Sequence, residues 1–478
     1  MKVLFVLQDL YTESIPLMTL SAVLKQAGHE TDLVLLSHEP NYKEAVKAFK
    51  PDMICFSVLG SMMREFYFNL SAELKKETPF VSVFGGVPAT MTPELFVSND
   101  AVDVVCVGEG DEAIVELVQA LQTGTDYTCI QNLWVKKNGT IYKNPVRNLI
   151  PMVDELPDPD RELIYKYPDF KEKEIKNFLT TRGCPFPCTY CYNHFMHGLY
   201  KGKGVYVRRR SVRRVIDEIK RVRDTYGLER VNFVDDLFTI DQKWVLEFCD
   251  VYKKEVGLPF ICQTRAEMVN DELARALKEA NCCSVDFAIE SGNDFLRNDV
   301  MRRNMTKEQI LNAGRVLHKH KVNFTTLNMV GLPGESIENA FETMELNAKV
   351  NPNYAAIYLY QPYEGLKLTE YAKEHGYLDK DKEKHVDYHY GVSLNLKNKH
   401  EFKNVHDLFF LGVKFPFLIP TIKKLVKAPS NPVYHAFGRG ASAYASLFVT
   451  QYTSLGFQLK RVKKLARLKL GLGAKASA

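Results

Sequence analysis

The sequence has no uninterrupted apolar run approaching the roughly 20 residues that a membrane-spanning helix needs. Met1 leads directly into the short apolar run Lys2–Leu7, which has neither the length nor the small-residue cleavage site of a signal peptide. We therefore expect a cytoplasmic protein. Hydrophobic residues make up 46% and charged residues 25% of the 478 residues, a composition that excludes a disordered or fibrous chain. At roughly 150 residues per domain, this length suggests about three domains.

Acidic residues are missing from the last part of the chain. Leu408–Ala478 contains twelve Lys and Arg and no Asp or Glu. Subtracting these twelve positive charges from the net charge of +5 leaves −7 for residues 1–407. The modest net charge therefore combines a mildly acidic body with a strongly basic tail.

Disulfide bonds are not expected, because the ten cysteines belong to a chain predicted to stay in a reducing compartment. Three of them have the close spacing Cys184-x3-Cys188-x2-Cys191. The others are scattered, and we expect them to be buried as small hydrophobic residues. These are Cys55, Cys106, Cys129, Cys249, Cys262, Cys282 and Cys283.

Apolar runs alternate with amphipathic stretches up to about residue 125, which predicts an α/β domain with an open, doubly wound parallel sheet. The expected strands are Lys2–Leu7, Thr31–Leu36, Asp52–Ser57, Phe80–Phe84 and Val102–Val107. The expected helices are Leu17–Ala27, Lys43–Phe49, Met63–Lys75 and Glu112–Leu121. In such a sheet, ligands bind at the carboxyl ends of the strands.

Three of these strand ends have residues that suit a ligand crevice. They are Ser57-Val58-Leu59-Gly60, Phe84-Gly85-Gly86-Val87-Pro88 and Val107-Gly108-Glu109-Gly110-Asp111-Glu112. The alternative for each is a tight strand-to-helix turn without a ligand. A dinucleotide is disfavoured, because no G-x-G-x-x-G follows Lys2–Leu7.

The three closely spaced cysteines follow a predicted linker, Pro151–Pro168, and a predicted strand, Ile175–Thr180. Three thiolates on one loop can hold three irons of a 4Fe–4S cluster and leave the fourth iron open. The alternative is a Cys3His zinc site that uses His194 or His197.

Helices and strands continue to alternate after the cysteines and predict a partial parallel barrel of six βα units, with reactive residues at the strand ends. The expected helices are Val212–Thr225, Trp244–Glu255, Asp271–Ala280, Lys307–His320 and Ile337–Val350. The expected strands are Glu229–Val234, Phe260–Arg265, Ser284–Ile289, Asn323–Val330 and Ala355–Tyr360.

The segment Thr181–Cys191 (TRGCPFPCTYC), with the later I-E-S-G and G-L-P-G-E segments, resembles the radical S-adenosylmethionine (SAM) superfamily. In that family the cluster's open iron binds SAM and one electron cleaves it to a 5′-deoxyadenosyl radical. The resemblance implies cluster ligation by Cys184, Cys188 and Cys191. It further implies that Tyr190, Gly331 and Pro333 surround the adenine of SAM and that Glu290 binds its ribose. Asp235 or Asp236 would face the amino group, and Arg265 and Arg210 would face the carboxylate. The alternatives are that Asp235 and Asp236 cap a turn and that the run Arg208–Arg210 is solvated.

The first domain resembles the cobalamin-binding domain that precedes many radical SAM domains, through its GG-x-P and GEGD turns. The D-x-H-x-x-G motif is absent, which is usual in that group and implies a corrin held without a protein histidine. By this resemblance the cobalamin-binding residues are Ser57, Leu59, Gly85, Gly86, Glu109 and Gly110.

The predicted domains are a cobalamin-binding-like Rossmann domain at 1–150, a linker at 151–172, a radical SAM barrel at 173–375 and a helical region at 376–478. In the last region Phe409–Pro420 is too short and broken to span a bilayer. Lys460–Lys469 has basic and apolar residues at helical spacing, which suits an anionic membrane surface. A helical cap followed by a solvated tail is favoured over this membrane contact. Contact with an acidic protein is less favoured, and no nucleic acid partner is expected.

The resemblance covers roughly residues 1–375 and implies cobalamin-dependent methylation of an unactivated carbon of a small molecule, with a flavodoxin- or ferredoxin-type electron donor. A membrane location would favour a lipid or other hydrophobic substrate. The alternatives are a radical ring-forming or rearranging enzyme of the anaerobic cyclase type and a non-catalytic cluster protein. An RNA methylthiolation enzyme is disfavoured, because Cys55, Cys106 and Cys129 lack the context of its second cluster.

Overall fold

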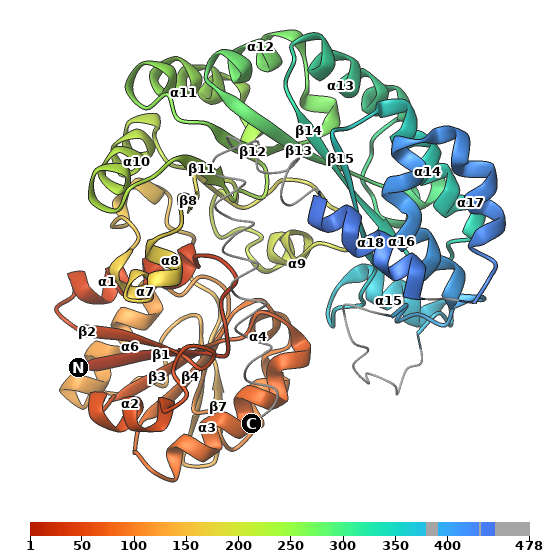
Figure 1. Cartoon of the computed structure of the whole chain (residues 1–478). Coiled ribbons are helices and arrows are strands. Elements are labelled where there is room, and N and C mark those ends of the chain that lie inside the picture. The colour runs from red at the N-terminus through yellow and green to blue at the C-terminus, as the bar shows by residue number, and fades with distance from the viewer. Residues whose placement is uncertain (379–390, 430–431, 445–478) are drawn as a thin grey trace, which may run out of the picture. The chain divides into compact units, whose positions relative to one another are not determined.

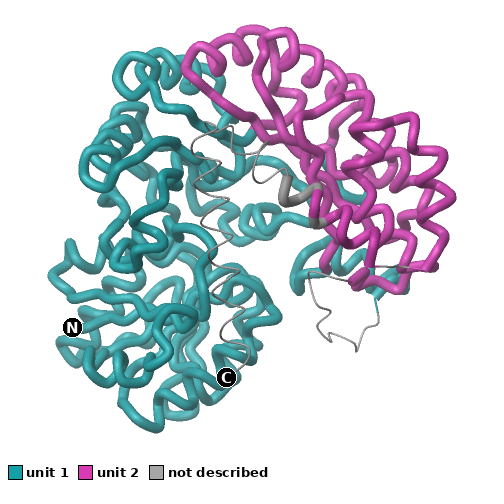
Figure 2. The backbone as a smooth tube through the Cα atoms, in the orientation of Figure 1, with its two compact units in different colours: residues 1–263, 300–303, 362–385 teal, residues 264–299, 304–361, 386–478 magenta. Residues whose placement is uncertain are grey.

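The computed structural model describes residues 1–378, 391–429 and 432–444. The chain forms two compact units, each assembled from separate segments (Figure 2). Unit 1 comprises residues 1–263, 300–303 and 362–385, and unit 2 comprises residues 264–299, 304–361 and 386–478. The predicted domain boundaries at 150, 172 and 375 remain a proposal.

Unit 1 begins with a seven-stranded sheet in the order β2-β1-β3-β4-β5-β6-β7 (Figure 1). The five expected strands are present and parallel, as β1 (Lys2–Leu7), β2 (Glu30–Leu35), β3 (Met53–Ser57), β4 (Val81–Gly85) and β5 (Val104–Cys106). Two further strands that the sequence analysis missed, β6 (Leu133–Lys137) and β7 (Thr140–Lys143), extend the sheet in antiparallel pairing. The sheet is therefore mixed at one edge.

Helices cover both faces of this sheet, as expected for a doubly wound domain. One buried cluster joins α1 (Ile15–Gln26) and α6 (Asp111–Thr123) to the sheet. The other joins α2 (Tyr42–Phe49), α3 (Arg64–Lys75), α4 (Val87–Met91) and α5 (Pro93–Val97) to the opposite face. Because successive strand residues point to opposite faces, Leu4 and Val6 belong to one cluster and Val3 and Phe5 to the other.

The predicted linker contains short helices that its sequence period did not reveal, namely η2 (Val153–Glu155), α7 (Glu162–Tyr165) and α8 (Pro168–Lys171). Unit 1 continues through β8 (Ile175–Phe178), β9 (Thr181–Arg182), α9 (Tyr192–Leu199), β10 (Arg208–Arg209), α10 (Val212–Tyr226), β11 (Arg230–Phe233), η3 (Phe238–Ile240), α11 (Gln242–Glu255) and the start of β12 (Phe260–Thr264). Strand β11 pairs in parallel with β8 and β12, and the short pair β9–β10 is antiparallel. Helix α15 (Lys367–Glu374) also belongs to unit 1.

Unit 2 carries the later βα units. Its elements are η4 (Ala266–Met268), α12 (Asp271–Glu279), β13 (Cys282–Glu290), the π-helix η5 (Phe295–Val300, which ends at the unit boundary), α13 (Lys307–Lys319), β14 (Phe324–Val330), α14 (Ile337–Val350) and β15 (Tyr354–Leu359). Strands β13, β14 and β15 are parallel neighbours. The order of strands and helices along the chain confirms the predicted six βα units.

From Lys399 onward, the described carboxyl-terminal part of unit 2 is mainly helical. It contains α16 (Lys399–Lys414), η6 (Pro416–Leu418), α17 (Ile419–Leu425) and α18 (Pro432–Tyr444). Helix α16 packs on α14 and β15 through a buried apolar cluster that includes Phe402, Val405 and Phe409. In the part of the chain that the structure describes, no helix is long and apolar enough to cross a membrane. The predicted basic segment Lys460–Lys469 lies outside the described residues.

Candidate cofactor sites

The three-cysteine loop lies between β9 and α9 in unit 1. Cys188 is buried, whereas Cys184 and Cys191 are half-buried. The loop is anchored at its middle, because the Thr189 N–H donates to the Met301 carbonyl at 3.1 Å and the Thr189 hydroxyl donates to the Val300 carbonyl at 2.8 Å. These bonds fix the backbone immediately beside Cys188 and Tyr190.

The donor chemistry of this loop fits an iron–sulfur cluster, since it offers three thiols and no other ligand-type side chain between them. Among the described residues, no three His, Cys, Asp or Glu side chains are already drawn together as a metal cage. The zinc alternative gains no support from His197, whose Nε2 lies 2.8 Å from the carbonyl oxygen of Cys184. The fit therefore rests on the thiols alone.

A polar chain supports Cys191 from the side of α9. The Asn193 amide nitrogen lies 3.6 Å from the Cys191 sulfur and donates to Asp236 at 3.0 Å, while the Tyr206 hydroxyl donates to Asn193 at 2.7 Å. Burial raises the pKa of the Cys191 thiol to about 12. A bound metal reverses this preference, because a coordinating thiol is deprotonated.

The two aspartates after β11 have different environments. Asp235 is buried, and its Oδ1 accepts hydrogen bonds from the Thr180 N–H at 3.0 Å and the Thr180 hydroxyl at 2.8 Å, while burial raises its pKa to about 6. Asp236 is exposed and accepts from Asn193 of α9. Asp235 thus ties the end of β11 to the end of β8, and Asp236 is the better placed of the two beside the cysteine loop.

Tyr190, expected at the adenine, is fixed by Arg303, whose guanidinium donates to the Tyr190 hydroxyl at 2.8 Å. Arg210, expected at the carboxylate, is committed elsewhere, because it forms ion pairs with Glu218 and with Asp158, the latter at 2.9 Å. Its side chain is only 12% exposed, so the alternative that Arg210 is solvated is wrong.

The predicted SAM-binding turns of unit 2 are tightly built. Glu290 ends β13 at a register shift with φ of +65° and is buried. A side chain at Gly292 would place its Cβ 2.3 Å from the Glu342 carbonyl oxygen, so only glycine fits this turn. Buried Arg297 donates to the carbonyl oxygens of Ser291 at 2.9 Å and Met305 at 2.7 Å. Arg265, at the end of β12, forms an ion pair with Glu267 at 2.5 Å.

The G-L-P-G-E turn closes on its own glutamate. The Glu335 Oε2 accepts from the N–H groups of Gly331 at 2.6 Å and Leu332 at 3.0 Å, which holds the turn around Pro333. Its Oε1 is buried and meets no hydrogen-bond partner within the described part of the chain. Burial raises the Glu335 pKa to about 8.

Glu335 gives a pH-dependent prediction. The folded protein keeps a proton on this carboxyl that the unfolded chain releases above its ordinary pKa of 4.5, so stability is fully present below that value and falls as pH rises toward about 8. The Glu335→Gln variant lacks this loss. We therefore expect the stability of the variant, measured relative to the parent protein, to be higher at pH 8 than at pH 6 by roughly 2 kcal/mol. Thermal unfolding at both pH values measures this difference. The exposed Glu338→Gln is the control, and an equal effect of Glu335→Gln at both pH values would contradict the prediction.

The predicted cobalamin-binding turns of β3 and β4 lie against each other. A Cβ at Gly86, which has φ of +100°, would lie 2.3 Å from the Val58 carbonyl oxygen, and the Val58 N–H donates to Gly85 at 2.9 Å. Leu59 is 62% exposed, and Met62 and Val87, which follow the same two strands, are also exposed. Tyr11, which follows the neighbouring strand β1, is exposed as well. An exposed apolar rim at the carboxyl edge of the sheet is the surface that a flat macrocycle requires.

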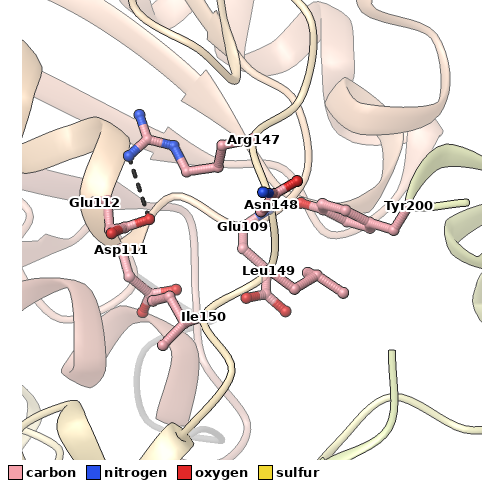
Figure 3. A pocket seen from close by; sticks show the side chains of 8 residues that line it. All are labelled: Glu109, Asp111, Glu112, Arg147, Asn148, Leu149, Ile150 and Tyr200. Carbon is pink, nitrogen blue, oxygen red and sulfur yellow. Dashed lines mark hydrogen bonds and ion pairs between the residues drawn. The ribbon is translucent and has the colours of Figure 1, made fainter. Parts of the chain in front are cut away.

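Glu109 and Gly110, also predicted to bind cobalamin, belong to a turn with internal partners. The Glu109 carboxylate forms ion pairs with Arg182, at 3.2 Å, and with Arg208. A small pocket lies beside this turn (Figure 3) and is lined by Glu109, Asp111, Glu112, Arg147, Asn148, Leu149, Ile150 and Tyr200. The sequence analysis missed the roles of Arg182, Arg208 and Tyr200. The arginine that directly precedes Gly183-Cys184 was the available signal, but nothing local indicates its partner.

Comparisons with known proteins match both parts of the chain to known families. Residues 178–346 match the radical SAM superfamily, and residues 1–118 match the B12 binding domain. An uncharacterized methyltransferase of Pyrococcus horikoshii is 31% identical over 337 residues, which are 68% of this chain and 70% of that protein. Cytidylyl-2-hydroxyethylphosphonate methyltransferase of Streptomyces wedmorensis is 26% identical over 377 residues, covering 70% of this chain and 69% of that protein. An anaerobic magnesium-protoporphyrin IX monomethyl ester cyclase of Rubrivivax gelatinosus is 25% identical over 363 residues, covering 72% of this chain and 63% of that protein.

Solved structures show the same fold. The radical SAM methyltransferase TsrM of Kitasatospora setae, solved with cobalamin and a [4Fe-4S] cluster, superposes with a TM-score of 0.66 at 16% identity and covers 78% of each chain. The chain therefore belongs to the radical SAM superfamily, among members with an amino-terminal B12-binding domain, and is an enzyme whose cofactors are a 4Fe–4S cluster, SAM and cobalamin.

Proposed function

We propose that this enzyme methylates an unactivated carbon of a small molecule in a cobalamin-dependent reaction. The observation that carries the proposal is that unit 1 contains both the three-cysteine loop and a sheet edge with an exposed apolar rim. Two relatives with similar coverage are methyltransferases, which favours methyl transfer. The similarity to a cyclase supports a ring-forming or rearranging reaction as the second candidate.

Cys184, Cys188 and Cys191 would hold the cluster. The anchored Thr189 fixes the position of the loop backbone between Cys188 and Cys191. When bound, the cluster supplies the electron that cleaves SAM to a 5′-deoxyadenosyl radical, and cobalamin carries the methyl group. For SAM, Asp236 would attract the amino group and Tyr190, held by Arg303, would lie on the adenine. Further SAM contacts are proposed for Arg265, Glu290, Gly331 and Pro333, and Asp235 would position the strand ends.

The corrin would lie on the rim formed by Leu59 and its apolar neighbours, where Ser57, Gly85, Gly86 and Gly110 let the backbone approach. Glu109 would act through its arginine partners.

Protein produced with cobalamin and reconstituted anaerobically tests the proposal. We expect corrin absorbance after desalting, and S-adenosylhomocysteine release from SAM that depends on the corrin. A cyclase-type enzyme would bind corrin but give only 5′-deoxyadenosine. Absence of corrin from the desalted protein would contradict cobalamin-dependent methylation.

We also propose that unit 2 contacts an anionic membrane surface at the turn between α16 and α17. Phe415 is 48% and Phe417 75% exposed, with ring centroids 6.1 Å apart. The next helix supplies Lys424 and Lys423, the latter paired with Glu345 at 2.8 Å. Exposed aromatic rings beside lysines suit a bilayer interface, and the basic tail adds charge of the same sign. A flavodoxin- or ferredoxin-type donor remains a prediction from the family.

Liposome flotation measures this membrane contact. We expect the protein to float with vesicles that contain phosphatidylglycerol and not with phosphatidylcholine alone, because the attraction is electrostatic. The double variant Phe415→Ser/Phe417→Ser is expected to lose most of this binding, whereas Tyr142→Ser, which removes an exposed ring from β7 of unit 1, keeps it. Equal flotation of both variants would contradict the assignment of the turn.

A further inference from the structure

Both flanks of the three-cysteine loop contact one turn of the amino-terminal sheet, residues 107–112. On the near flank, Arg182 lies two residues before Cys184 and makes a bidentate pair with Asp111, at 2.7 and 3.0 Å. The same guanidinium lies 3.2 Å from Glu109. A bidentate arginine–carboxylate pair fixes orientation as well as distance. The backbone that leads into Cys184 is thus oriented by the turn.

On the far flank, Tyr200 follows α9, the helix that begins directly after Cys191. Its hydroxyl accepts from the Glu109 N–H at 2.7 Å, and its ring is buried. A Cβ at Gly108 would lie 2.1 Å from that hydroxyl oxygen, so the turn fits closely around the ring. Figure 3 shows Tyr200 reaching the pocket beside Glu109 from a different segment.

A second arginine completes the contact. Arg208, on β10, pairs with Glu109, and β10 is hydrogen-bonded to β9, where Arg182 lies. The cluster of Glu109, Asp111, Arg182 and Arg208 contains two acidic and two basic groups. The Arg182 guanidinium holds the pKa of the buried Asp111 below its usual range. The four side chains pair with one another, so two arginines beside the cysteine loop are tied to this one turn.

We propose that Arg182 and Tyr200 are positioning residues that couple the cobalamin site to the cluster, so that occupation of the corrin site slows loss of the cluster. The turn that they contact follows β5 at the carboxyl edge of the sheet, and it contains Glu109 and Gly110. Binding that orders this turn also orders Arg182 and Tyr200, and through them both ends of the cysteine loop. The inference rests on the proposed cobalamin-binding function.

Iron release from the reconstituted protein tests the coupling. A ferrous chelator is added anaerobically to cluster-loaded protein with and without hydroxocobalamin, and release is followed by absorbance. We expect cobalamin to slow release severalfold in the parent protein and to have no effect in Arg182→Met. Tyr200→Phe, which removes only the hydroxyl, is expected to reduce the effect, and Arg182→Lys to restore part of it.

Arg147→Met is the matched control. Figure 3 shows Arg147 beside Glu112, and its other partners are Glu116, Asn132 and Gln131. These partners all precede residue 133, so this variant should keep the full cobalamin effect. Corrin uptake without any change in iron release in the parent protein, or an unchanged cobalamin effect in Arg182→Met and Tyr200→Phe, would overturn the coupling alone. Absence of corrin uptake would overturn the proposed function and the coupling with it. Thermal unfolding of each variant identifies any that fail to fold. If Arg182→Met does not fold, the cobalamin effect in Tyr200→Phe tests the coupling.

Discussion

Replacement of Cys184, Cys188 or Cys191 by alanine is expected to abolish the cluster and with it SAM cleavage. The loop supplies three thiols, and a cluster that needs three thiolates has no substitute donor between them. Each single variant should contain iron and sulfide near background after anaerobic reconstitution. With dithionite and SAM, 5′-deoxyadenosine should fall below detection by chromatography.

The sequence analysis expected Cys129 to be buried, and this was wrong, because Cys129 is exposed. As an exposed cysteine of the same unit, it gives the control Cys129→Ala for these variants. It should retain the iron, the sulfide and the cleavage activity of the parent protein. Full cluster content in any one of the three loop variants would remove that cysteine from the ligand set. Stoichiometric zinc in place of iron in the parent protein would instead favour the Cys3His alternative.

The strands and helices of the core were predictable because their apolar periods are local. Strand β1 was predicted with its observed bounds, and β2 to β5 within one or two residues at each end. The hairpin β6–β7 was missed although Asn138-Gly139 between the strands is a hairpin signal. Helices α4 and α5 were missed, although each has a proline in its first turn, a position that suits a helix start.

The candidate sites were also predictable only where their residues are close in sequence. The three cysteines could be predicted because their spacing places them on one loop. The partners of Glu109 could not, because Arg182 and Arg208 lie 73 and 99 residues further along the chain. The sequence analysis for this reason assigned Glu109 to cobalamin directly and Arg210 to solvent or to SAM. The partners of such side chains can be identified only in the structure, because pairing between residues distant in sequence leaves no local pattern.

The largest effect on stability is expected at Arg161, a buried cation in the predicted linker. Its guanidinium pairs with Glu218 at 2.8 Å and Glu13 at 3.4 Å, and it donates to the Asn177 carbonyl oxygen at 2.8 Å. The three charged side chains are at most 4% exposed. The network joins the residues before α1, the linker and α10.

Arg161→Met is expected to destabilise the protein by about 3 to 5 kcal/mol, because two buried carboxylates lose a charge partner that water cannot replace. Glu218 keeps its pair with Arg210, whereas Glu13 keeps only hydrogen bonds, from the Tyr165 hydroxyl and the Asn177 N–H. Urea unfolding of the anaerobic apoprotein measures the change. Arg213→Met is the control, since Arg213 is 51% exposed in its pairs with Asp217 and Glu255 and its loss should destabilise the protein far less. Equal losses for the two variants would show that the buried network contributes no more than a surface ion pair, and the linker would then be held by its apolar contacts alone.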